Sequence, residues 1–102
     1  MSKDEKQESL NNPQELQIQI PPEIQRGAYA NNMVVAHTQE EFVLDFILAT
    51  PPVGTVNARV IVSPSHAKRI AQAMVENIQK YEARFGEVEN IPAALPSDTI
   101  TH

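Results

Sequence analysis

The chain has 102 residues and a mass of 11.3 kDa, the size of one domain. It has no cysteine, which excludes disulfides, thiolate-bound zinc, iron–sulfur clusters and cysteine nucleophiles. Eight Lys and Arg stand against thirteen Asp and Glu, but residues 16–86 carry six of each, so the net charge of −5 lies in the two ends. A body without surplus cations argues against nucleic-acid binding, because phosphate contacts need clustered Lys and Arg.

The two ends of the chain differ from its middle in composition. Residues 1–15 are polar and charged, and residues 87–102 combine two prolines with three acids. Neither end has enough apolar surface to offset the entropy lost on ordering. We therefore expect two flexible acidic tails around a single domain over residues 16–86. Since there is no leader and no apolar run of about 18 residues, we also expect a cytoplasmic protein rather than a membrane protein.

Strand patterns occupy the first part of the body. Residues 16–20 alternate leucine and isoleucine with glutamine, the period-two pattern of an edge strand, which Pro21 ends. Residues 33–37 predict a second strand, and the four polar residues at 38–41 predict a hairpin loop after it.

Two longer apolar runs, residues 42–48 and 56–62, flank a turn that contains proline and glycine, and they predict a β-hairpin. If the numbers of opposed residues sum to an even value, the even-numbered aliphatic residues share one face of the sheet. Asp45 and Arg59 then share the other face, where they can pair. A buried carboxylate must be paired, hydrogen-bonded or protonated. We expect an ion pair that fixes register or assembly rather than a catalytic acid.

A long helix is predicted between Ser63 and Gly86. Serine is a preferred N-cap, proline at position 64 suits the first helical residue, and glycine is a common stop. The twenty-two residues between them would span about 33 Å. An apolar stripe at three-and-four spacing is expected to cover the even-numbered face of the sheet. Its members are Ala67, Ile70, Ala71, Met74, Ile78, Tyr81 and Phe85.

The predicted fold class is α+β, a mainly antiparallel β-meander of three to four strands packed on one long C-terminal α-helix. One helix covers only one face of such a sheet. The back face would stay open, and exposed apolar patches usually mark an interface. We therefore expect a homodimer or a larger assembly. The apolar residues of that face are Val34, Ala36, Val43, Ile47 and Ile61.

Four stretches of the sequence resemble a known family. They are residues 29–31 (YAN), 41–46 (EFVLDF), 59–69 (RVIVSPSHAKR) and 76–82 (ENIQKYE). In order and spacing they are similar to a small bacterial family, the domain of unknown function numbered 3467, and the resemblance spans residues 16–86. It implies no activity, substrate, cofactor or catalytic residue.

Two groups of polar residues could be catalytic or metal-binding, but each also fits a purely structural role. Ser63 and His66 are spaced like an activated hydroxyl, but without an orienting acid or an oxyanion hole we expect a helix cap. His37 with Glu40 and Glu41 offers metal-ligand types without paired spacing, so we expect a solvated loop and no metal.

Lys68 and Arg69 begin the polar side of the predicted helix. At that end of a helix, cations gain nothing from the macrodipole. They are candidates for contact with an anion or an acidic partner, helped by the free N–H groups of the helix start. An ordinary solvated helix face is the favoured reading.

The predicted function is a non-enzymatic oligomeric protein-interaction module, adaptor or chaperone-like, without a cofactor. It is expected to form a homo-oligomer and to hold a protein partner. The alternative is a ligand-binding or enzymatic subunit whose composite site forms between protomers. Single-stranded nucleic acid is a third reading, which needs exposed aromatic residues. The candidate interaction or assembly residues are Asp45, Arg59, His66, Lys68 and Arg69.

Overall fold

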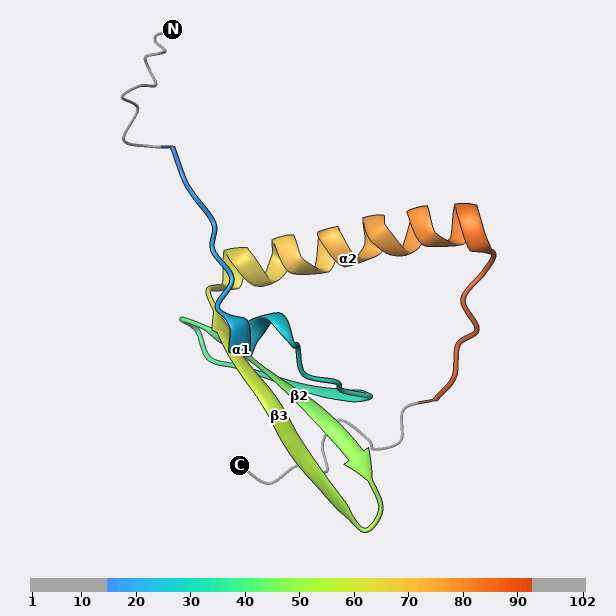
Figure 1. Ribbon diagram of the computed structural model, residues 1–102, viewed down its shortest axis with the longest axis horizontal. Coiled ribbons are helices and arrows are strands. Elements are labelled where there is room, and N and C mark those ends of the chain that lie inside the picture. Colours follow the sequence, from blue (N-terminus) through green and yellow to red (C-terminus); the bar gives the residue numbers. More distant parts are fainter. Residues whose placement is uncertain (1–14, 93–102) are drawn as a thin grey trace, which may run out of the picture.

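The computed structural model describes residues 15–92 (Figure 1). Within them, three strands form an antiparallel sheet in the order β1-β2-β3, and a long helix follows. This confirms the α+β fold, a β-meander with a C-terminal helix. The expected tails fall largely on residues 1–14 and 93–102, which lie outside the described residues. The elements are α1 (Pro22–Gln25), β1 (Asn32–His37), β2 (Phe42–Thr50), β3 (Val53–Val62) and α2 (Pro64–Phe85).

The β2–β3 hairpin has the predicted register in the half that lies away from its turn, between residues 42–46 and 58–62. Asp45 lies opposite Arg59, and Phe46 lies opposite Ala58. The register then shifts by one residue, because Ile47 pairs with Val56 and leaves Asn57 as an extra residue in β3. Such a β-bulge bends its strand and increases the local twist. The sequence pattern had not indicated it.

The register of β1 on β2 decides which side chains share a face. Val34 lies opposite Asp45, and Ala36 lies opposite Val43. The residues predicted for the back face therefore do share it, and we call it the Asp45 face. The opposite side, here the Phe46 face, is almost entirely apolar. It carries Met33, Val35, His37, Phe42, Leu44, Phe46, Leu48, Ala58, Val60 and Val62.

The chain crosses β2 just before β1 begins. The carbonyl of Tyr29 accepts a hydrogen bond of 2.7 Å from Nδ2 of Asn57 on β3. Two residues later, the backbone N–H of Asn31 donates to the carbonyl of Ile47 on β2. β1 and β3 flank β2 on opposite sides, so the segment around residues 29–31 must pass over β2.

The core is small, and it includes Ile47, whose carbonyl accepts from Asn31 at this crossing. Val34, Asp45 and Ile47 are 6%, 1% and 0% exposed, and they are the buried residues of the described chain. All three belong to the Asp45 face. The expectation that this face would be open is therefore wrong at its centre, although Ala36 and Ile61 remain exposed.

Residues 16–20 do not form the predicted edge strand. They lie outside the sheet, and the side chains of Leu16, Ile18 and Ile20 are 57% to 88% exposed. Figure 1 shows this segment leading from α1 past the start of α2 and away from the strands. The alternating pattern is present, but the described chain provides no neighbouring strand for it.

Helix α2 begins and ends where predicted, but its apolar stripe does not pack on the sheet as predicted. Oγ of Ser63 accepts from the N–H of His66 at 3.1 Å, and Gly86 ends the helix at φ +98°. No residue of α2 is buried, and its half-buried apolar residues are Ala67 and Ile70 in the first two turns. The remaining turns extend away from the strands (Figure 1). The prediction that the apolar stripe of the helix covers the Phe46 face along its whole length is therefore wrong for a single chain.

Candidate functional site

Asp45 and Arg59 form a bidentate ion pair across β2 and β3. Nε of Arg59 donates to Oδ1 of Asp45 at 2.7 Å, and Nη2 donates to Oδ2 at 2.9 Å. The side chain of Asp45 is 1% exposed, whereas that of Arg59 is 51% exposed. The hydrogen bond and the charge of Asp45 together raise the pKa of Arg59. Arg59 is therefore charged at neutral pH.

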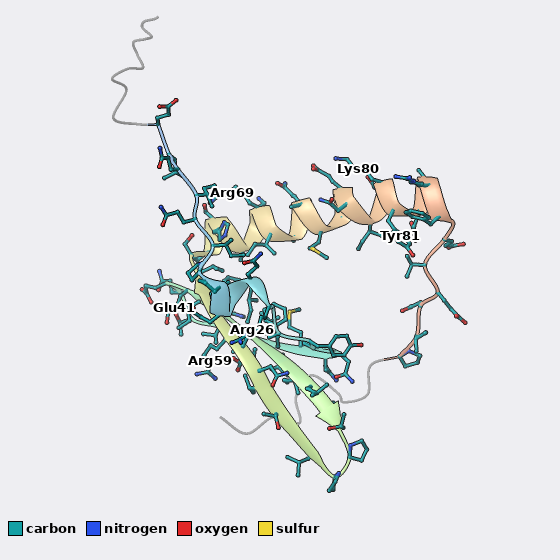
Figure 2. All side chains as sticks on the ribbon, in the orientation of Figure 1. Arg26, Glu41, Arg59, Arg69, Lys80 and Tyr81 are labelled. Carbon is teal, nitrogen blue, oxygen red and sulfur yellow. The ribbon has the colours of Figure 1, made fainter. Side chains whose placement is uncertain are left out.

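The ion pair has a clear structural use. A slip of one residue between β2 and β3 would place the two side chains on opposite faces of the sheet. The buried carboxylate would then lose its partner, which is strongly unfavourable. The pair occupies both carboxylate oxygens of Asp45, and its role in fixing the register stays a prediction. The side chain of Arg59 is half-exposed to solvent (Figure 2).

A second polar group lies at the start of α2. Arg69 donates to Oγ of Ser65 at 3.0 Å, and its other terminal nitrogen lies 3.1 Å from Nδ1 of His66. A guanidinium can only donate, so Nδ1 accepts in this contact. The imidazole is thereby directed to Arg69, and the hydroxyl of Ser63 is directed to the backbone of His66. Ser63 acts as the expected helix cap.

The candidate residues fall into two groups on different elements. Asp45 and Arg59 lie on the strands, while His66, Lys68 and Arg69 lie in the first turns of α2. Lys68 is exposed. Across residues 15–92, no three His, Cys, Asp or Glu side chains are grouped so that they could hold a metal ion.

The side-chain hydroxyl of Thr38 organises the loop after β1. Oγ1 of Thr38 accepts from the N–H groups of Glu40 and Glu41, at 3.2 and 3.3 Å. His37 stacks on Phe42 with ring centroids 5.2 Å apart. All three candidate metal ligands of the sequence, His37, Glu40 and Glu41, are exposed.

Two asparagines have roles that sequence reasoning had not assigned. The amide of Asn31 donates to the carbonyl of Ala49 at 3.1 Å and accepts from its N–H at 2.8 Å. The side-chain amide of Asn31 thus makes the pair of hydrogen bonds to β2 that the backbone of a neighbouring strand would make. Asn57, the extra residue of the bulge, anchors Tyr29. The tripeptide at 29–31 is one of the stretches behind the family resemblance, and this crossing is a structural reason for it.

The largest feature of the described surface is apolar. Five side chains of α2 are 43% to 64% exposed, and we call them the α2 stripe. Figure 2 shows Tyr81 of the stripe and Lys80 on opposite sides of the helix. The rings of Tyr81 and Phe85 lie 5.0 Å apart. The α2 stripe consists of Met74, Val75, Ile78, Tyr81 and Phe85.

The Phe46 face adds to this apolar surface. Met33, Val35 and Val60 are each more than two-fifths exposed on it. An open hollow on α2, lined by Ala71, Gln72, Val75 and Glu76, lies along the flank of the stripe. None of the helices within residues 15–92 has the length and the apolar character needed to cross a membrane.

Comparison with known proteins identifies the family but no characterised relative. No curated protein and no solved structure matches the chain. A family model matches residues 1–90. The matched region therefore extends beyond residues 16–86 and takes in the first fifteen residues. The chain belongs to the family described as a protein of unknown function (DUF3467).

Proposed function

We propose that this chain is the protomer of a non-enzymatic, homo-oligomeric protein-interaction module, in which a second copy covers the α2 stripe and the Phe46 face. One observation carries the proposal: α2 has 22 residues and none of them is buried. Most helical stability in proteins comes from packing of an amphipathic face rather than from propensity. An apolar stripe of this length therefore needs a partner.

The exposed apolar area is of the size that a stable interface uses. The α2 stripe and the three exposed residues of the Phe46 face amount to eight side chains. At on the order of 100 Å² each they supply about 800 Å² per copy, which is what a typical stable interface buries on each partner. A two-fold pair buries the same patch on both copies, so the assembly closes.

The polar candidates support a non-enzymatic role. Asp45 is bound by Arg59, Ser63 caps α2, and His66 faces Arg69. Each therefore has a structural task. In the proposed assembly, the cations at the start of α2, Lys68 and Arg69, remain on the surface for a protein partner, as in an adaptor or a chaperone. A cytoplasmic location is part of the proposal, and fractionation of expressing cells tests it.

A pair of variants tests the interface. Ile78→Glu places a charge in the α2 stripe, and Gln79→Glu places the same charge one residue later, toward the polar side of the helix. In sedimentation equilibrium the wild type and Gln79→Glu should associate, whereas Ile78→Glu should sediment as single chains of 11.3 kDa. Equal association of both variants would exclude the stripe as the interface. A wild type that stays monomeric would overturn the proposal.

A further inference from the structure

Residues 16–20, here the amino-terminal segment, have the features of a strand without a sheet. The segment carries no charge and alternates three large aliphatic residues with Gln17 and Gln19. Those aliphatic side chains are 57% to 88% exposed. Pro21 and Pro22 follow at once, so the strand pattern cannot continue into α1. A short uncharged β-prone segment in water is a natural partner for a free sheet edge.

The edge of β1 can receive such a segment. β1 pairs with β2 on one side only, since the order of the sheet is β1-β2-β3. The N–H of Thr38 donates to the carbonyl of Glu41, in the register of β1 on β2. Backbone groups alternate in direction along a strand. Those of Met33, Val35 and His37 therefore point to the outer edge, where the N–H of Met33 already donates to Oδ1 of Asn32 at 2.7 Å. The outward groups of Val35 and His37 are the ones that would receive a further strand.

The two outer edges of the sheet differ in how they are guarded. Proteins protect edges with charges, prolines and bulges. β3 has a bulge at Asn57 and the charged Arg59. β1, with the sequence NMVVAH, has no Asp, Glu, Lys, Arg, proline or bulge. The unprotected edge of β1 is therefore the better acceptor.

The chain's own β1 is not the acceptor. After Pro21 the chain forms α1, crosses the Asp45 face and only then enters β1. The amino-terminal segment leads away from the strands in Figure 1. In a two-fold pair, by contrast, each copy can offer one segment and one β1 edge. Reciprocal exchange would cover the β1 edges of both copies with segments that the two copies already carry.

We propose that the amino-terminal segment of one copy pairs with the outer edge of β1 in a second copy. This inference rests on the proposed self-association and adds the contact that makes it reciprocal. Ile18 would lie beside Val35 and extend the apolar Phe46 face of the partner sheet, with the glutamines on the other side. Each three-stranded sheet would gain a fourth strand, which is the number at the upper limit of the sequence prediction.

Cross-linking tests the exchange, because the chain has no cysteine of its own. An affinity-tagged full-length chain with Ile18→Cys is co-expressed with an untagged chain carrying Val35→Cys. The purified mixture is treated with a short thiol-specific cross-linker. The matched control replaces Ile18→Cys by Gln19→Cys, which places the thiol on the opposite face of the segment. Sedimentation equilibrium of the wild type is measured in parallel.

The inference predicts a covalent species with one tagged and one untagged chain for Ile18→Cys, and much less of it for Gln19→Cys. If the wild type associates but the two pairs cross-link equally or not at all, strand exchange is wrong while self-association stands. If the wild type is monomeric, self-association itself is wrong and the exchange is excluded with it.

Discussion

Asp45 and Arg59 meet across the central hairpin with opposite exposures: the carboxylate is enclosed, and the guanidinium that binds it reaches the solvent. The two partners are therefore not equivalent. Removing Arg59 leaves a charge inside the protein, whereas neutralising Asp45 leaves a charge that water can solvate. Breaking a buried pair is costly mainly because of the uncompensated charge that remains.

Replacement of the buried partner should be the milder change. Asp45→Asn keeps the size of the side chain and loses a charge-assisted pair, and we expect the free energy of unfolding to fall by about 1–3 kcal/mol. Arg59→Met should lower it more. Thermal unfolding at a fixed chain concentration measures both. The double variant should recover part of the loss of Arg59→Met, and a greater loss for Asp45→Asn than for Arg59→Met would contradict this account.

The crossing over β2 should depend on Asn31. Asn31→Ala removes both hydrogen bonds to the backbone of Ala49, and we expect a loss of about 1–2 kcal/mol in the free energy of unfolding. Asn90→Ala, at an exposed position after α2, is the control and should change stability by less than about 0.5 kcal/mol. Denaturant unfolding of the two variants side by side makes the comparison. Equal stability of both would show that Asn31 does not hold the crossing.

The role of Ser63 as a cap can be separated from a role in chemistry. Ser63→Ala removes the acceptor for the N–H of His66 and should cost about 1 kcal/mol, while Ser63→Gly should cost only a few tenths, because glycine is tolerated at an N-cap. Thermal melting followed by circular dichroism measures both. Ser65→Ala, which removes only an exposed contact with Arg69, is the control. Equal losses for alanine and glycine would speak against capping.

Formation of α2 should be coupled to association. The α2 stripe has no cover within the described chain, and isolated helices are marginal in water. On dilution below the dissociation constant, the helical circular dichroism signal should fall together with the fraction of associated chains. The Gln79→Glu variant should follow the wild type. A helical signal that is constant while the assembly dissociates would show that α2 is stable alone.

The sequence predicted the helices and strands of this fold better than the surfaces against which they pack. Three predictions are confirmed: the even-sum register between residues 42–46 and 58–62, the pairing of Asp45 with Arg59, and both ends of α2. Each depends on local chemistry: alternation along a strand, a cap, a glycine stop. The bulge at Asn57 escaped prediction, because the hydrogen bond that this residue makes is with Tyr29, 28 residues away, and local patterning does not indicate such a contact.

The errors of prediction concern what covers an apolar surface. Periodicity in α2 shows that one side must be buried, but not against which surface. The same holds for residues 16–20, whose alternation indicates a strand without indicating a neighbour. The Asp45 face shows the converse: its centre is buried, and the residues 29–31 that bond to β2 and β3 beside it have no periodic pattern. A second copy of the chain would resolve both errors at once.

Sedimentation equilibrium of the full-length wild-type chain tests the central claim most directly. Over a range of micromolar concentrations at neutral pH, self-association through the α2 stripe predicts a mass of twice the 11.3 kDa of the chain, or a higher closed multiple. Circular dichroism on the same samples establishes that the helix is formed. A mass of 11.3 kDa at every concentration, with α2 fully helical, would contradict the account.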